Sequence, residues 1–326
     1  MKIIYLFWGF ARGKARFLYK LLLTNSSVAR RLLRKDNVAG SSSLYCYRIW
    51  MKHLKNWSRV SNETPKVVVE IGPGDSLGVG LAALISGSHK YYALEKTQFW
   101  NVETNIRVFD ELVIFFKNRD KTQAIEINED ENNDLMQMDF PSNILTEEYL
   151  SECLAEERLN AIRLELLDPE NLNNVYIHSI IPWNSRDIIE NNTVDYIFSH
   201  TVLQHLHDLP YDYKTMNQWL KSGGCMSHTI DFTCLNRTKL WNGHWTLSKL
   251  EWKIITGGIS LINREPLSTH LQLLKANDFE IKYQKSVLSD NTLKVEDLSD
   301  EFKRLDIKDL TTSGYYYFAQ LRNKQE

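Results

Sequence analysis

The sequence predicts an α/β fold in which a mainly parallel sheet carries helices on both faces. Three observations support this prediction. Residues Val67 to Val69 are consecutive and β-branched, as expected of a strand that is buried on both faces. Gly72 and Gly74 follow this run and let the backbone turn sharply. A second apolar run, Tyr91 to Leu94, then ends at the acid Glu95. Together these features predict a strand, a glycine turn, a helix and a second strand.

The two acids of this stretch indicate what kind of ligand the turn would bind. Glu95 follows the first glycine at a distance typical of an acid that accepts hydrogen bonds from the ribose of a nucleotide-like cofactor. Glu70 stands two residues before Gly72, where it would repel a pyrophosphate and attract an amino group or a sulfonium cation. A βαβ turn without any ligand is the alternative.

The stretch Glu70-Ile71-Gly72-Pro73-Gly74 resembles the first motif of the class I S-adenosylmethionine-dependent methyltransferases, an acid followed by x-Gly-x-Gly. The resemblance implies a Rossmann-like seven-stranded methyltransferase sheet and S-adenosylmethionine as cofactor. It also implies that Glu70, Gly72, Gly74 and Asp75 lie near the methionine part of the cofactor, and that Glu95 holds the ribose.

Three more strands are predicted to complete the parallel part of the sheet. Val175 to Ile181 is the third and ends beside Trp183, which could lie on an adenine ring or belong to the core. Val194 to Ser199 is the fourth. The fifth, Cys225 to Phe232, follows a helix that we expect to end in a glycine cap over residues 219–224.

The segment HTVLQHLHDL after the fourth strand resembles the family's segment beside the sulfonium and the acceptor. The resemblance places Gln204, His205 and Asp208 at the mouth of the cleft. His205 is suited to take a proton near neutral pH, and Asp231 and His244 are alternative bases. The other interpretation of His205 is a core histidine.

A long aromatic-rich connection, about 232–268, is predicted to form a cap over the acceptor. Trp241, Trp245 and Arg264 are its candidate substrate-binding residues, although an internal aromatic cluster would have the same composition. Residues 279–288 and 315–321 are then predicted as two closing strands, with an acidic helical piece from Val295 to Leu310 between them. Such a closing pair is typical of this methyltransferase fold.

Composition limits the remaining choices. A chain of 326 residues with 43% hydrophobic residues can bury a full core. The four cysteines have no C-x-x-C spacing, so we expect neither a zinc site nor a disulfide framework, and a cytoplasmic location fits. No metal cluster is visible, and no metal is expected. No apolar run reaches the 18 residues that span a bilayer.

Charge separates the chain into two parts. Residues 1–60 hold 13 Lys or Arg and one acid. We expect residues 1–62 to form a basic helical extension, and residues 63–326 the cofactor-binding domain with an insertion at about 117–172. The extension could bind an anionic membrane at its inner face through residues 1–35, bind nucleic acid, or pack on the domain with its bases in water. Its short apolar part and the lack of a cleavage site argue against a signal peptide.

The expected function is transfer of a methyl group from S-adenosylmethionine to a small-molecule or saccharide acceptor, at a hydroxyl oxygen. The segments MSHTIDF, WNGHW and NREPLSTH resemble methyltransferases found among bacterial surface-polysaccharide genes. The alternatives are a non-catalytic partner subunit that binds S-adenosylmethionine or RNA, and an RNA methyltransferase. Nucleic acid is disfavoured because no aromatic-and-basic RNA motif occurs beyond the basic arm.

Overall fold

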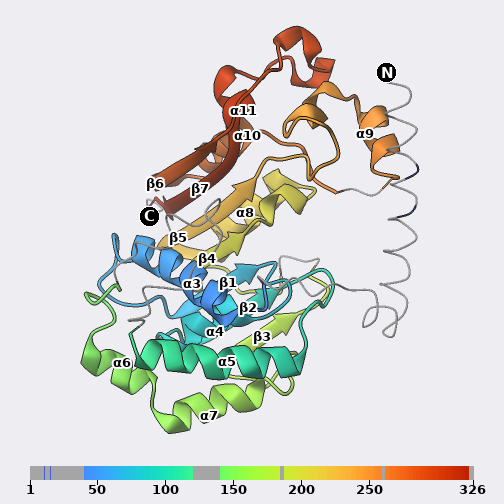
Figure 1. Cartoon of the computed structure of the whole chain (residues 1–326). Helices are drawn as coiled ribbons and strands as arrows, with labels where there is room; N and C mark the ends of the chain where they lie inside the picture. Colours follow the sequence, from blue (N-terminus) through green and yellow to red (C-terminus); the bar gives the residue numbers. More distant parts are fainter. Residues whose placement is uncertain are drawn as a thin grey trace.

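The computed structural model describes residues 11, 15, 40–119, 140–183, 187–258 and 261–322 of the chain (Figure 1). Its helices and strands are, in order, α3 (Ser43–Trp57), β1 (Val67–Ile71), α4 (Gly78–Ile85), β2 (Lys90–Leu94), α5 (Val102–Lys117), α6 (Glu147–Cys153), α7 (Glu156–Glu165), β3 (Ile177–Ile180), β4 (Val194–His200), η1 (Leu203–His205), α8 (Leu209–Trp219), β5 (Leu220–Asp231), η2 (Gly243–Thr246), α9 (Lys249–Ile255), α10 (Leu267–Ala276), β6 (Phe279–Leu288), η3 (Val295–Asp297), η4 (Asp300–Phe302), α11 (Ile307–Thr311) and β7 (Thr312–Leu321).

The strands form one seven-stranded sheet in the order β3-β2-β1-β4-β5-β7-β6. Strands β1 to β5 are parallel to one another, and β7 lies antiparallel between β5 and β6. In Figure 1 the sheet runs through the middle of the molecule, with β3 and β6 toward its two edges. The predicted fold, a Rossmann-like mixed sheet closed by two antiparallel strands, is confirmed.

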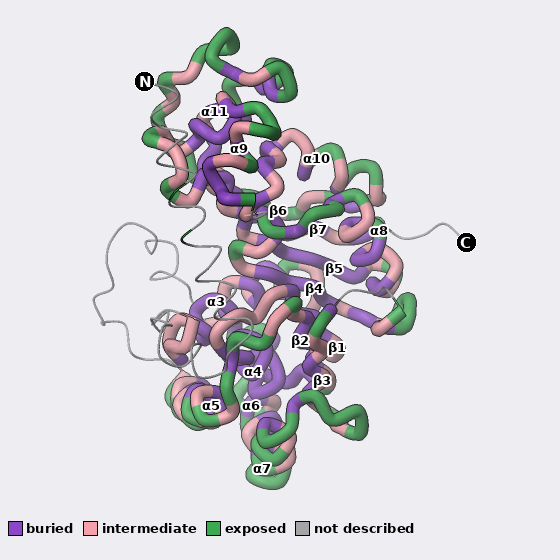
Figure 2. The backbone as a smooth tube through the Cα atoms, turned by 90° about the vertical axis from the view of Figure 1, so that its right-hand side faces the viewer, coloured by how far each residue is buried: buried purple, intermediate pink, exposed green. Residues whose placement is uncertain are grey.

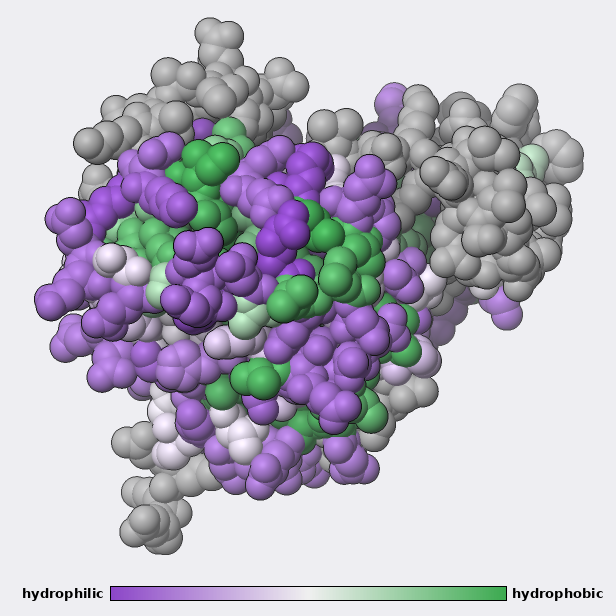
Figure 3. Space-filling view, turned by 90° about the horizontal axis from the view of Figure 1, so that it is seen from below, coloured by the Kyte–Doolittle hydropathy of each residue, from purple (hydrophilic) through white to green (hydrophobic). Residues whose placement is uncertain are grey.

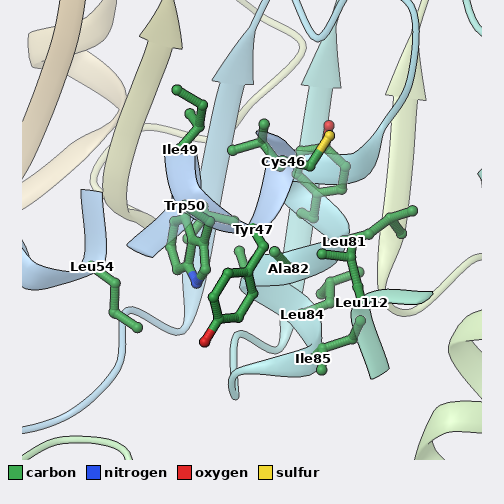
Figure 4. Close-up of a cluster of buried hydrophobic side chains, with 14 of the residues drawn as sticks. Cys46, Tyr47, Ile49, Trp50, Leu54, Leu81, Ala82, Leu84, Ile85 and Leu112 are labelled. Atoms are coloured by element: carbon green, nitrogen blue, oxygen red, sulfur yellow. The ribbon is translucent and has the colours of Figure 1, made fainter. Parts of the chain in front are cut away.

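Helices cover both faces of the sheet because successive strand residues point to opposite sides. On one face Val68 and Phe198 pack with α3, α4 and α5, in the cluster that Figure 4 shows around Trp50. On the other face Val69 and Ile197 pack with α8 and α10. Figure 2 accordingly shows buried backbone in the central strands and exposed backbone on outer helices such as α7.

The described part of the insertion contains two helices, α6 and α7, which are separate because the backbone is extended at Ala155 (ψ 135°). Two predictions about individual elements are wrong. The residues around Gly223 are part of β5, which begins directly after α8, and they do not form a helix cap. The acidic piece from Val295 to Leu310 consists of the short turns η3 and η4 and the start of α11.

The regions predicted to flank the sheet lie partly outside the described residues. Within the extension, α3 is present and packs on the sheet, whereas most of residues 1–35 and residues 120–139 of the insertion lie outside the described part of the chain. In the described part, the helices are too short or too polar to cross a membrane. Figure 3 shows that the face seen from below is mainly hydrophilic, with separate apolar patches.

The cap-like segment has a small core of its own. Trp245 packs there with Leu298, Phe302, Leu305 and Leu310, which come from the η3 to α11 region. The cap therefore packs against a segment that is far from it in the sequence. It follows the carboxyl end of β5, where the predicted site lies.

Candidate functional site

The glycine turn after β1 has the geometry that the sequence predicted. Gly72 and Gly74 both have left-handed backbone, with φ of +72° and +73°, which favours glycine. A Cβ atom on Gly72 would lie 2.7 Å from a methyl carbon of Val202, so this glycine allows the close approach of β1 to the segment after β4. A Cβ atom on Gly74 would meet no atom within 4 Å. The turn is thus closely packed at Gly72 and open at Gly74.

Glu95 lies beside the open part of this turn. Its Oε2 accepts a hydrogen bond from the amide of Gly74 at 3.4 Å, and its Oε1 accepts one from the amide of Lys96 at 2.8 Å. Burial raises the pKa of the carboxyl group, and the backbone hydrogen bonds oppose that shift. The structure therefore brings together Gly74 and Glu95, which are 21 residues apart in the sequence.

Glu70 is placed differently from what was expected. Its side chain is buried on the α4 face of the sheet, and its Oε2 accepts a hydrogen bond from the Tyr91 hydroxyl at 2.5 Å. Burial raises the pKa of Glu70 to about 8, against the effect of the hydrogen bonds from Tyr91 and from the backbone of Gly80. Burial therefore favours the neutral acid. It does not present a carboxylate on an open surface.

The turn is closed on one side by the segment that leads into α3. Ser76 donates a hydrogen bond from its hydroxyl to the carbonyl of Gly40 at 2.7 Å. A Cβ atom on Gly40 would lie 3.3 Å from the Cβ of Asp75. Asp75 is therefore close to Gly40, in the segment of the extension that leads into α3.

A cleft of about 240 Å³ lies next to Glu95. The amide of Trp183 donates to the carbonyl of Glu95 at 2.8 Å, which places the tryptophan at the cleft. Its side chain is 8% exposed and also packs near Trp219, so it lines the cleft and belongs to the core. The residues around the cleft are Lys96, Trp183, Leu206, His207, Asp208, Tyr211 and Asp212.

Most residues of this cleft were not predicted from the sequence. Lys96 directly follows Glu95, and Asp212 lies in the first turn of α8. Burial raises the pKa of Asp212 to about 6. Asp208 accepts a hydrogen bond from the amide of Tyr211 and is the N-cap of α8. The N-cap pattern at Asp208 could have revealed these residues, because it predicts that a helix, α8, begins at this edge of the sheet.

The turn η1 carries Gln204 and His205 at the end of β4. Gln204 is buried and donates from Nε2 to the carbonyl of Thr201 at 2.8 Å. Its Oε1 is buried and has no hydrogen-bond partner among the described residues. His205 is exposed, and its Nδ1 lies 2.6 Å from the carbonyl oxygen of Leu261. His205 is therefore a surface residue of this edge and not a core histidine.

The other two candidate bases have contrasting surroundings. Asp231 is half-buried at the end of β5, and its Oδ1 accepts a hydrogen bond from the amide of Thr233 at 2.7 Å. His244 is 1% exposed and packs against Trp245, with ring centroids 4.6 Å apart. Burial lowers the pKa of His244 to about 3. Because its ring is enclosed in the cap, the prediction that His244 acts as a base has no structural support.

The candidate substrate-binding residues are mostly structural. Trp245 is fully buried and donates from Nε1 to the carbonyl of Arg264 at 2.9 Å. Arg264 is also buried, and its guanidinium donates to the carbonyl oxygens of His244 and Leu247. Trp241 is partly exposed and donates to the carbonyl of Asp290. Trp245 and Arg264 thus stabilise the cap through these hydrogen bonds.

Among the residues that the structure describes, no group of three or more His, Cys, Asp or Glu is placed to bind a metal ion.

No protein-family model and no curated protein sequence matches the chain. Similar solved structures include an S-adenosylmethionine-dependent methyltransferase from Mesorhizobium loti, with 10% identity, a TM-score of 0.39, and coverage of 86% of this chain and 98% of that chain. Geranyl diphosphate methyltransferase in complex with S-adenosylmethionine has 12% identity and a TM-score of 0.43, with 85% of each chain covered.

A third similar structure is phosphoethanolamine N-methyltransferase 2 from Haemonchus contortus, in complex with phosphomonomethylethanolamine and S-adenosylhomocysteine. It has 13% identity and a TM-score of 0.42, with 89% of this chain and 59% of that chain covered. Identities and TM-scores this low leave the function of the chain to be argued from its own residues.

Proposed function

We propose that the chain is an S-adenosylmethionine-dependent methyltransferase whose cofactor binds at the carboxyl ends of β1 and β2. The observation that carries the proposal is the meeting of the Glu95 carboxylate and the Gly74 amide, 3.4 Å apart, at this edge. The backbone at Gly74 is open, so a ligand can approach it closely. Ligands of open α/β sheets bind outside the carboxyl ends of the strands.

The surroundings of Glu95 fit the separate parts of this cofactor. The Glu95 carboxylate can accept hydrogen bonds from two ribose hydroxyls. Trp183 and Leu206 line the neighbouring cleft, where we place the adenine ring, and Asp212 lines the same cleft with a carboxyl that can bind a polar edge of that ring. When bound, S-adenosylmethionine supplies an electrophilic methyl group on a sulfonium ion.

His205 is the base that we assign to the reaction. The Leu261 carbonyl can only accept a hydrogen bond, so the neutral ring carries its proton on Nδ1 and presents a lone pair at Nε2. That lone pair can take the proton of an acceptor hydroxyl, while η1 orients the ring. Asp231, half-buried at the root of the cap, is the second candidate.

The acceptor that we propose is a small molecule or a saccharide, methylated at a hydroxyl oxygen. Two observations support this choice: the apolar side chain of Trp241 is partly exposed, and Asp231 has a half-buried side-chain carboxyl that can bind hydroxyl groups. A saccharide of a bacterial surface polysaccharide is the narrower form of this proposal, and it rests on the resemblance of three short segments alone.

Calorimetric titration of the full chain with S-adenosylmethionine and S-adenosylhomocysteine tests the cofactor assignment. Glu95→Gln should weaken binding tenfold or more, because each hydrogen bond to a charged group is worth about 1.5–3 kcal/mol. Glu103→Gln, an exposed acid in the first turn of α5, is the matched control and should bind like the wild type. Equal affinity in Glu95→Gln would remove the ribose role, and lack of binding by the wild type would overturn the proposal.

A labelled-methyl assay tests the acceptor class. The protein is incubated with radiolabelled S-adenosylmethionine and cell extract, which is then separated into lipid, small-molecule, saccharide, RNA and protein fractions. Label in the small-molecule or saccharide fraction is the expected result. Label in RNA alone would overturn the acceptor assignment and favour an RNA methyltransferase.

A further inference from the structure

Residues Leu261 and Asn263 of the cap form hydrogen bonds with η1, the turn that carries His205. Besides the contact between Leu261 and the His205 ring, the amide of Asn263 donates to the carbonyl of Gln204 at 2.8 Å. The side-chain Nδ2 of Asn263 donates to the carbonyls of Leu203 and Leu206, at 2.8 Å and 2.9 Å. These contacts link residues about 60 positions apart in the sequence.

Both Nδ2 hydrogens and the Oδ1 atom of Asn263 form hydrogen bonds in this arrangement. Its two Nδ2 hydrogens meet the carbonyls of Leu203 and Leu206, the first residue of η1 and the residue that follows it. Its Oδ1 accepts a hydrogen bond from the amide of Glu265 at 2.9 Å. An amide has one acceptor oxygen and two donor hydrogens, so only Asn fits this pattern at its length. Asp would place an oxygen against both carbonyls.

The contact between Leu261 and His205 determines which ring nitrogen is basic. A carbonyl oxygen has lone pairs and no hydrogen, so His205 Nδ1 must be the donor in the 2.6 Å contact. In the neutral ring, Nε2 is then the acceptor. If the carbonyl of Leu261 moved away, the proton could occupy either nitrogen, and part of the population would lack a basic Nε2.

We propose that Asn263 and the Leu261 carbonyl are positioning groups that hold η1 and keep His205 in the tautomer with a basic Nε2. This inference rests on the proposed function, in which His205 is the base. As the acceptor oxygen forms its bond to the methyl carbon, the bond from that carbon to the sulfonium sulfur breaks and its electron pair stays on sulfur, while the acceptor's O–H bond breaks and the proton moves to Nε2. The hydrogen on Nδ1 remains hydrogen-bonded to the Leu261 carbonyl oxygen, and this contact also stabilises the resulting imidazolium. In this proposal the cap positions the base for the reaction.

The tautomer of His205 can be measured directly by long-range ¹H–¹⁵N correlation NMR on the full chain with ¹⁵N-labelled histidine, above the pH at which the ring is protonated. His205→Gln identifies the signals by their loss. The wild type should show a protonated Nδ1 and an unprotonated Nε2. A wild-type ring that is protonated on Nε2 would overturn the inference without the use of any variant.

Asn263→Asp then tests the role of the cap. It should convert the His205 signals to a mixture of tautomers and lower kcat at least tenfold, with the affinity for S-adenosylmethionine unchanged within about twofold. Asn242→Asp is the matched control, because Asn242 Nδ2 binds Asn291 and the carbonyl of Leu310, inside the cap and away from η1. It should leave the tautomer as in the wild type.

The outcomes of this test differ from those of the proposed function. An unchanged tautomer in folded Asn263→Asp would refute the positioning role even if the protein binds S-adenosylmethionine. Lack of cofactor binding would refute the proposed function even if the tautomer is as expected. If Asn263→Asp does not fold, Asn263→Ser removes the two Nδ2 donors without adding a charge, and the same change in tautomer is expected.

Discussion

Replacement of Glu70 by Gln should make the protein more stable at alkaline pH. Glu70 is 5% exposed, and burial raises its pKa from 4.5 to about 8. Between these two values the folded state keeps a proton that the unfolded state has released. The free energy of unfolding of the wild type therefore falls as the pH rises from about 4.5 to about 8, and this contribution is constant above that range.

The size of the effect follows from the shift in pKa. Each pH unit in this window contributes at most about 1.4 kcal/mol, so the whole window contributes at most about 5 kcal/mol. Gln has nearly the same shape, its oxygen can accept the hydrogen bond from Tyr91, and it does not titrate. The variant should resemble the wild type near pH 5 and exceed its free energy of unfolding by several kcal/mol at pH 8.

Urea denaturation followed by far-UV circular dichroism, at each pH from 5 to 9, measures this difference. The difference between variant and wild type removes the contribution of all other titrating groups. Glu103→Gln is again the control, because its carboxyl is exposed, and its difference from the wild type should not change with pH. Parallel stability curves for Glu70→Gln and the wild type would refute the reasoning and show that Glu70 is ionised in the folded protein.

Other predictions concern acid stability, the cap and the turn. Burial lowers the pKa of His228 to about 3, so the folded protein should lose stability as the pH falls below about 6.5, and His228→Gln should reduce that loss in urea denaturation curves. Arg264→Lys should lose carbonyl contacts and destabilise the cap by about 1–3 kcal/mol, seen as faster amide hydrogen exchange at 243–255. Gly72→Ala should lower the melting temperature because its Cβ would meet Val202, whereas Gly74→Ala, which has open space, should cost only about 1–2 kcal/mol of backbone strain.

Strands were predictable where burial alone determines the residue type. The run Val67 to Val69 belongs to β1 because both of its faces are covered. The third strand was predicted from Val175, whereas β3 begins at Ile177. The amides of Val175, Tyr176 and Ile177 all donate to the Glu165 carboxylate, so the edge before β3 is bound by α7. A side chain ten residues earlier sets this boundary, and no local pattern reveals it.

The candidate site was predictable only in part, for a similar reason. The glycine turn and Glu95 are linked by local sequence spacing, and the structure brings them together. Composition could not distinguish an aromatic residue that lines a cleft from one in a core, so Trp245 was proposed for substrate binding although it is fully buried. The partners of His205 come from Leu261 and Asn263, and contacts over such a separation depend on the tertiary fold.

A crystal structure of the full chain with S-adenosylhomocysteine tests the central claim most directly. The account predicts that the ribose hydroxyls lie within hydrogen-bond distance of the Glu95 carboxylate and that the adenine occupies the cleft lined by Trp183 and Asp212. His205 Nε2 should face the side of the cofactor from which the methyl group leaves. The account would be contradicted if the ligand bound at another place, with Glu95 and the cleft in contact with solvent only.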